Sequence, residues 1–254
     1  MRLCLLTLCA LVLAAGSAHA QPGAAERACV AGDAEACLLF AEQLHKSGDA
    51  TRVKRAQELY ENLCKRRVDQ ACFNLAVLYD EANDAGRARR LYVRACRRGH
   101  QDACYNLAVV QEKEGAVGKA YKGYAAVCAK GNLAGCVTLG FHYEWGGEEL
   151  PRDETRAAEL YRQACDGDDG LGCTSLASMY ADGRGVSADL VQARALHHKS
   201  CQSGNMTGCT KFGMMLERGQ GGTADKSAAE SLYVRACEGG VRMACDLKQQ
   251  ETKK

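Results

Sequence analysis

The sequence predicts an all-α protein, an α/α superhelical solenoid of antiparallel helix pairs with one disulfide in each repeat. Cysteines recur in pairs spaced by eight residues, and the first members of the pairs stand at positions 29, 64, 96, 128, 165, 201 and 237. The composition is rich in alanine, leucine and charged residues, and its two prolines are Pro22 and Pro151. Successive first cysteines are 32 to 37 residues apart. A repeat period of this length is typical of stacked helical repeats rather than of one large core.

Each cysteine pair is interpreted as a bridge across a helix–turn–helix. Ala88 and Tyr92 precede Cys96 at helical spacing, and Gly99 after it suits the left-handed conformation that ends a helix. The last turn of one helix then faces the first turn of the next, within the separation that a disulfide prefers. The expected pairs are Cys29 with Cys37, Cys64 with Cys72, Cys96 with Cys104, Cys128 with Cys136, Cys165 with Cys173, Cys201 with Cys209, and Cys237 with Cys245.

Zinc is the competing interpretation of paired cysteines. Structural zinc sites commonly use cysteines two to four residues apart, in fours or with histidines. A spacing of eight without attendant histidines favours disulfides, and we expect no metal or other cofactor.

The first twenty residues have the pattern of a secretory signal peptide. Arg2 precedes an apolar run from Leu3 to Ala15, and Ala18-His19-Ala20 forms an Ala-x-Ala cleavage site. We therefore expect a mature chain from about Gln21 without a membrane span, in the periplasm or secreted. Fourteen paired thiols suit such an oxidising compartment.

Residues 21–254 are expected to form one array of about six helix pairs with a capping half-repeat at each end, without an internal domain boundary. The first helix of each pair (the A helix) is predicted near 35–46, 70–82, 102–114, 134–145, 171–182 and 207–218. The second (the B helix) is predicted near 53–65, 86–97, 117–129, 154–166, 189–202 and 225–238, and a last helix begins at about 243.

Residue types hold their register around every pair. Alanine stands eight residues before the first cysteine from Ala56 to Ala229, and tyrosine stands four before it, except for His197. Glycine usually follows three after it, and Arg67 and Asp168 depart from this rule. Small residues at fixed helical offsets allow neighbouring helices to approach closely.

These marks resemble a known family. The run from Leu176 to Val186, with Gly183-Arg184-Gly185, followed by Ala193 and Cys201, resembles the Sel1-like repeat, a relative of the tetratricopeptide repeat. The cysteine pair in each repeat is similar to the exported cysteine-rich Hcp-like branch. The resemblance implies a disulfide-stapled α/α solenoid with two functional traditions, a protein-interaction scaffold and a connection to β-lactams or peptidoglycan fragments. The second and third repeats have shorter periods and no Gly-x-Gly loop.

The residues themselves favour a non-catalytic protein. No Ser-x-x-Lys motif of serine β-lactamases occurs. His197 and His198 point about 100° apart on a helix, and His197, in the tyrosine register, is expected to pack in the core. His100 is expected to lie solvated in a turn. Weak β-lactam hydrolysis, or penicillin binding, stands as the alternative that the resemblance carries. The formal net charge of +2 provides no strongly positive electrostatic potential of the kind that attracts nucleic acid.

A candidate binding face lies on the A helices, two, five and nine residues after each second cysteine. These offsets share one helical face, whereas the residues three and four after the cysteine face the core. The face varies from repeat to repeat, as recognition of a protein or peptide requires. Phe141 and Trp145 are its aromatic anchors, although Trp145 can instead pack the loop at Gly146-Gly147. The face comprises Asn74, Val77, Asn106, Val109, Thr138, Phe141, Trp145, Ser175, Ser178, Asp182, Met214 and Arg218.

Overall fold

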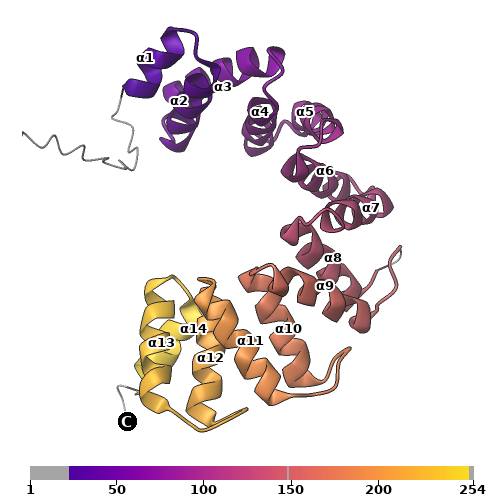
Figure 1. Ribbon diagram of the computed structural model, residues 1–254, viewed down its shortest axis with the longest axis vertical. Coiled ribbons are helices and arrows are strands. Elements are labelled where there is room, and N and C mark those ends of the chain that lie inside the picture. The colour runs from indigo at the N-terminus through magenta and orange to yellow at the C-terminus, as the bar shows by residue number, and fades with distance from the viewer. Residues whose placement is uncertain (1–22, 148, 252–254) are drawn as a thin grey trace, which may run out of the picture. The chain divides into compact units, whose positions relative to one another are not determined.

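The computed structural model describes residues 23–147 and 149–251 (Figure 1). Within these ranges the chain forms fourteen helices and no strand. The all-α class and the repeating helix pairs are therefore confirmed. The predicted signal peptide, with Cys4 and Cys9, lies outside the described residues.

The chain divides into two compact units, residues 1–71 and 72–254. In the first unit, α1 (Ala24–Val30), α2 (Ala34–Lys46) and α3 (Ala50–Lys65) pack in order, each against the next. The half-repeat α1 is joined to α2 by the disulfide between Cys29 and Cys37, with an S–S distance of 2.00 Å. One undivided array over residues 21–254 stays a prediction.

In the second unit, A and B helices alternate to the end of the described chain (Figure 1). Helix α4 begins just before this unit, and α14 is the closing half-repeat. Most helices lie within one residue of their expected bounds, whereas α3 begins three residues early. The helices are α4 (Asp69–Glu81), α5 (Ala85–Arg97), α6 (Gln101–Lys113), α7 (Val117–Cys128), α8 (Leu133–Trp145), α9 (Glu154–Asp166), α10 (Gly170–Asp182), α11 (Leu190–Gln202), α12 (Met206–Arg218), α13 (Lys226–Glu238) and α14 (Arg242–Glu251).

Short polar residues start most of these helices. The Asp169 carboxylate, for example, accepts a hydrogen bond from the Gly172 amide at 2.7 Å, which satisfies an amide that has no partner within the helix. The turn before each A helix contains a residue with positive φ. Arg67 and Asp168 adopt this conformation too, with φ of 69° and 65°, so their departure from glycine leaves the turn unchanged.

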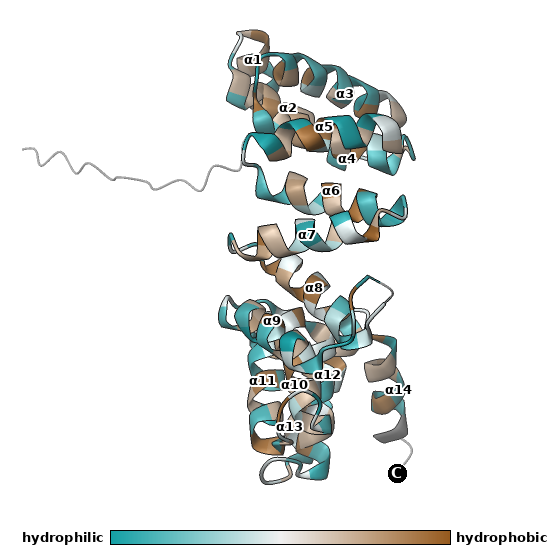
Figure 2. Cartoon of the chain, turned by 90° about the vertical axis from the view of Figure 1, so that its right-hand side faces the viewer, coloured by the Kyte–Doolittle hydropathy of each residue, from teal (hydrophilic) through white to brown (hydrophobic). Residues whose placement is uncertain are grey.

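Helices of the second unit pack against their sequence neighbours, and A helices also contact each other, α8 with α10 and α10 with α12. Helices carry both polar and apolar residues along their length, as helices half-buried between neighbours do (Figure 2). In these repeats the A helices therefore form a contiguous layer, and the residues that this layer presents between adjacent A helices are a continuous surface.

The tyrosine register is the centre of the core. Tyr92, Tyr124, Tyr161 and Tyr233 are fully buried. The small residue four after each second cysteine makes room for these rings, because a Cβ at Gly140 would come within 2.8 Å of the Tyr161 ring. Gly213 and Tyr233 repeat the same contact at 2.8 Å. The small-residue register of the sequence thus reflects the packing of one tyrosine per repeat.

Candidate binding face on the A helices

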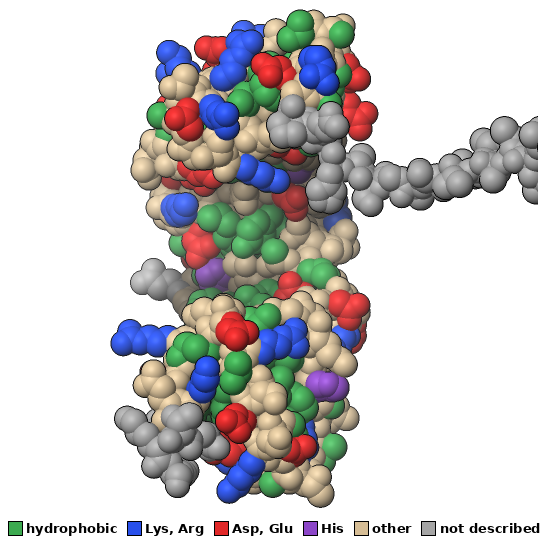
Figure 3. Space-filling view, turned by 90° about the vertical axis from the view of Figure 1, so that its left-hand side faces the viewer, with side chains coloured by type: hydrophobic (Ala, Val, Ile, Leu, Met, Phe, Trp, Pro, Cys, Tyr) green, Lys and Arg blue, Asp and Glu red, His purple; other side chains and the backbone are tan. Residues whose placement is uncertain are grey.

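The candidate face borders two pockets between consecutive A helices. The first, called here the α8–α10 pocket, has a volume of about 250 Å³ and is lined by Val137, Thr138, Phe141, Tyr161, Leu171 and Ser175. Three of these belong to the predicted face. Hydrophobic side chains reach the molecular surface among charged ones in the space-filling view (Figure 3).

Phe141 and Trp145 are both exposed, by 53% and 66%. Their rings lie one helical turn apart, with centroids 6.2 Å from each other. In the loop that follows α8, a Cβ atom added to Gly147 would lie 3.5 Å from the Tyr121 hydroxyl. An indole that remains two-thirds exposed is not buried by the loop, so the structure favours a surface role for Trp145 over loop packing.

The second pocket, called here the α10–α12 pocket, has a volume of about 280 Å³. Four predicted face residues, Ser178, Asp182, Met214 and Arg218, line it. Lys211, at the same repeat offset as Ser175, lines it as well. The remaining walls are Ala181, Leu190, His197, Met215 and Gln220. The spacing rule thus brings side chains from two repeats around one cavity.

The earlier repeats present their face residues differently. The Asn106 amide donates a hydrogen bond to the Tyr92 hydroxyl at 3.3 Å, and Val109 packs against the hydrophobic core. Asn74 and Val77 on α4 are half-buried. Neither of the two pockets includes these four residues. Among the predicted face residues, it is therefore those of α8, α10 and α12, apart from Trp145, that line cavities.

Beneath the face, tyrosine hydroxyls donate to carboxylates of the A helices. Tyr124 donates to Glu112 at 2.7 Å and Tyr161 to Glu144 at 2.7 Å. Burial, and then the carboxylate of Glu112 or Glu144, raises the pKa of these two tyrosines well above its ordinary value. These acids were not predicted from the sequence, although Glu112 and Glu144 each stand eight residues after the second cysteine of a pair.

The Gly-x-Gly loops do more than join helices. Arg184, between Gly183 and Gly185, donates to the Glu144 carboxylate two helices earlier. This pair satisfies a nearly buried carboxylate and fixes the loop against α8. Gly185 has φ of 63°, and a Cβ there would fall 2.1 Å from the Glu154 carbonyl oxygen. Glycine is required here for close approach to the start of α9.

Each described cysteine sits in a disulfide. Cys64 and Cys72 are among these bonded residues. Disulfide-bonded sulfurs hold no free thiolate for nucleophilic attack or metal binding. In the second unit, five bridges with Cα separations of 4.4 to 4.7 Å join partners eight residues apart, as expected, and they are Cys96 with Cys104, Cys128 with Cys136, Cys165 with Cys173, Cys201 with Cys209, and Cys237 with Cys245.

The second cysteine of each bridge lies in the first turn of the following helix. Cys104 is in α6, Cys136 in α8, Cys209 in α12 and Cys245 in α14. Cys136 and Cys209 are fully buried. The interpretation of the spacing as a staple across a helix–turn–helix therefore agrees with the structure at these four positions.

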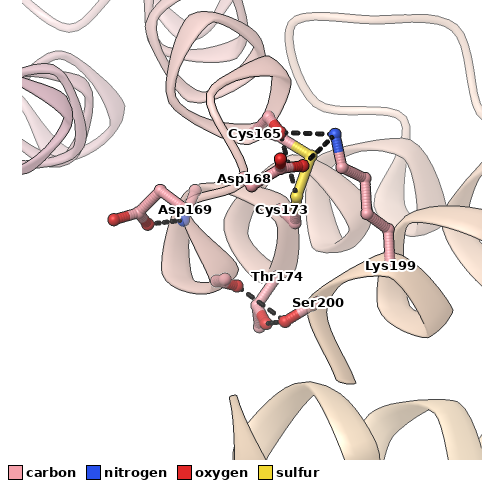
Figure 4. The surroundings of a disulfide bond; sticks show 9 residues. Cys165, Asp168, Asp169, Cys173, Thr174, Lys199 and Ser200 are labelled. Carbon is pink, nitrogen blue, oxygen red and sulfur yellow. Dashed lines mark hydrogen bonds and ion pairs between the residues drawn. A yellow bond between two sulfur atoms is a disulfide. The ribbon is translucent and has the colours of Figure 1, made fainter. Parts of the chain in front are cut away.

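Side chains of the next repeat secure the bridge between Cys165 and Cys173 (Figure 4). Lys199 donates to the Cys165 carbonyl oxygen at 2.7 Å and pairs with Asp168 at 3.0 Å. Ser200 donates to the Gly170 carbonyl oxygen at 2.6 Å and accepts from Thr174 at 2.7 Å. The staple therefore also anchors α11 onto the preceding repeat.

The histidines are mostly structural. His197 is buried, as expected, whereas the solvated position expected for His100 is wrong. His100 caps α6, where its Nδ1 accepts from the Ala103 amide at 3.3 Å, and its ring stacks on Phe73 at 4.5 Å. His142 lies 3.2 Å from Glu112. In the described ranges, no three His, Cys, Asp or Glu side chains lie close enough to hold a metal ion. No helix there is long and apolar enough to cross a membrane.

Comparison with known protein families finds a match for this chain. The model of the Sel1 repeat matches residues 69–100, 134–169, 171–205 and 208–241, together more than half of the chain. No curated protein matches the chain.

Solved structures are similar to this chain to different extents. A protective antigen from uropathogenic Escherichia coli, described as displaying an SLR fold, is 26% identical with a TM-score of 0.67, over 85% of this chain and 48% of its own. A Sel1 repeat protein from Oxalobacter formigenes is 20% identical with a TM-score of 0.69, over 80% and 85%. Cysteine rich protein B of Helicobacter pylori is 25% identical with a TM-score of 0.43, over 51% and 92%. This chain spans about half the length of the first.

Proposed function

Because this chain belongs to the Sel1 repeat family, we propose that it is a non-catalytic scaffold that binds a peptide segment of a protein partner on its A helices. Repeat proteins of this kind generally serve as protein-interaction scaffolds, since stacked helices offer an extended surface for a chain to lie along. The proposed surface comprises the face residues of α8, α10 and α12.

The exposed pair of Phe141 and Trp145 is the observation that carries this proposal. Tyrosines of the repeat register are buried, yet these two large rings face solvent, and Phe141 lines a cavity. Exposed aromatics near the centre of a patch are typical binding anchors. The adjacent pockets would accept alternate side chains of the bound peptide.

The proposed location is the periplasm or the outside of the cell. The disulfide in each repeat supports this location, because such bonds persist in oxidising compartments. The signal-peptide pattern of residues 1–20 supports it independently. Membership of the exported Hcp-like branch is part of this proposal.

Selection of random peptides displayed on phage, with the oxidised full-length chain as bait, tests the proposal. Synthetic versions of the selected peptides are then titrated against Phe141→Ala and Trp145→Ala. We expect each variant to weaken binding about thirtyfold, the equivalent of roughly 2 kcal/mol for an anchor residue. Thermal unfolding should remain unchanged, because both side chains are exposed.

The matched control is Val191→Ala, since Val191 is 65% exposed but lies on α11, a B helix, and lines neither pocket. This variant should bind as the unaltered chain does. Binding that survives both aromatic substitutions, or that Val191→Ala weakens equally, contradicts the proposed face.

A further inference from the structure

The α10–α12 pocket interrupts the pattern of buried tyrosine–carboxylate pairs. In the repeats on either side, Tyr161 donates to Glu144 and Tyr233 donates to Glu217 at 2.9 Å. Here the tyrosine position holds His197, and the carboxylate position holds Ala181. Both residues line the pocket. A change at both partners removes a satisfied buried pair and leaves a cavity beside an imidazole.

His197 has a buried nitrogen without a partner. Its side chain is only 3% exposed, and Nδ1 has no hydrogen-bond partner among the described residues. Buried polar atoms in native proteins nearly always have partners, and an orphan costs free energy. His197 also lines the open α10–α12 pocket, which places this unsatisfied imidazole at the wall of a cavity.

Charged side chains make the same pocket electropositive. Lys211 and Arg218 line it, and neither forms an ion pair with another described residue. The single acid in the wall, Asp182, lies 3.4 Å from Arg184, which also pairs with Glu144, so the two cations outnumber the one acid of the lining. Burial, and then the charge of Lys211, lowers the pKa of His197 to about 4. At neutral pH the imidazole is therefore an uncharged hydrogen-bonding group beside two unpaired cations.

The pocket also has an apolar side. Leu190, Met214 and Met215 contribute to its walls. Lys211 and Arg218 are seven residues apart on α12, about two helical turns on one face, so their long side chains can approach one ligand group from both sides. A ligand that fits this lining carries a negative charge next to an apolar group of modest size.

We propose that the α10–α12 pocket binds a carboxylate attached to an apolar side chain, as found at the C-terminus of a peptide. Lys211 and Arg218 hold the carboxylate, His197 makes a neutral hydrogen bond, and the methionines contact the apolar group. This inference rests on the proposed peptide-binding function and names one end of the peptide. A free small carboxylic acid shares the chemistry, so the experiment separates the two sources.

Calorimetric titration of the oxidised full-length chain tests this assignment. The probes are N-acetyl-Ala-Ala-Leu with a free carboxylate, the same tripeptide as its C-terminal amide, and N-acetyl-leucine. We expect the acid to bind at least about tenfold more tightly than the amide, because charge-assisted hydrogen bonds are lost in the amide. Tighter binding of the tripeptide than of N-acetyl-leucine assigns the site to a peptide end, and equal binding assigns it to a small acid.

Substitutions locate the site. Lys211→Met and Arg218→Met should each weaken binding of the acid about tenfold, whereas the exposed Lys130→Met, outside the pocket, should not change it. The double variant Ala181→Glu with His197→Tyr rebuilds the pair of the neighbouring repeats and fills the cavity. We expect the double variant to fold with an unchanged or higher Tm and to bind N-acetyl-Ala-Ala-Leu no longer.

Three outcomes overturn the inference: equal affinity for acid and amide, undiminished binding in the double variant, or no binding of any acid. Each leaves the proposed function standing if phage-selected peptides still depend on Phe141 and Trp145. Binding of the acid together with loss of that dependence has the opposite meaning, because it keeps the α10–α12 pocket and rejects Phe141 and Trp145 as anchors of the proposed face.

Discussion

Replacement of Arg184 by methionine measures the value of the loop-to-helix ion pair. The pair joins Arg184 to Glu144, whose side chains are 29% and 10% exposed. Without Arg184, the carboxylate keeps one hydrogen bond, from Tyr161. Breaking a fully buried pair costs about 3–5 kcal/mol. Because Arg184 is almost a third exposed, we expect a smaller loss of about 2 kcal/mol in the free energy of unfolding.

Urea unfolding monitored by circular dichroism measures this loss, and thermal unfolding should show a fall in Tm of about 4–8 °C. The matched control is Arg156→Met, which removes a surface pair with Glu159 whose side chains are 54% and 52% exposed. We expect that control to change stability by less than about 0.5 kcal/mol. Equal losses in the two variants would refute the role assigned to the Gly-x-Gly loop.

Four further predictions concern the staples, the loop, the buried histidine and catalysis. Non-reducing peptide mapping should recover each paired cysteine with its partner eight residues away, and bridges between repeats would contradict this pairing. Strong reductant should lower Tm sharply, because each repeat buries little apolar surface alone. An unchanged Tm would show that the disulfides are not needed for stability. Gly185→Ala should lose more than about 1 kcal/mol, measured by urea unfolding, because the new Cβ meets the Glu154 carbonyl. Burial lowers the pKa of His197 to about 4 in the folded chain, so on acidification the unfolded chain takes up this proton at a higher pH than the folded chain does. The free energy of unfolding should therefore fall by up to roughly 3 kcal/mol as pH drops from 6.5 to 4. If His197→Gln leaves the pH profile of stability unchanged, His197 is not the group responsible. A chromogenic cephalosporin should show no turnover that follows the protein through purification.

The helices and their bridges were predictable because they follow from short-range rules. The eight-residue cysteine spacing, together with a left-handed turn after the first cysteine, defines the end of one helix and the start of the next. The tyrosine and small-residue registers then fix which sides pack. Even His197, which breaks the tyrosine register, lies where that register placed it.

Other features depend on distances that the sequence does not contain. The contact of Arg184 with Glu144 joins residues 40 positions apart, a separation that no helical spacing rule covers. His100 was expected in solvent because its turn is exposed, but stacking on Phe73 and capping of α6 hold it in place. Contacts between A helices likewise determine which residues of the candidate face border cavities, and the sequence does not contain these contacts.

The emission of Trp145 tests the central claim most directly, because it is the single tryptophan in the chain. In the free protein its indole is two-thirds exposed. When a phage-selected peptide is titrated into the oxidised full-length chain, binding on the A helices should shift the emission to shorter wavelength and protect it from acrylamide quenching. A peptide that binds with the same affinity by calorimetry, yet leaves both the emission and the quenching unchanged, would contradict the proposed face.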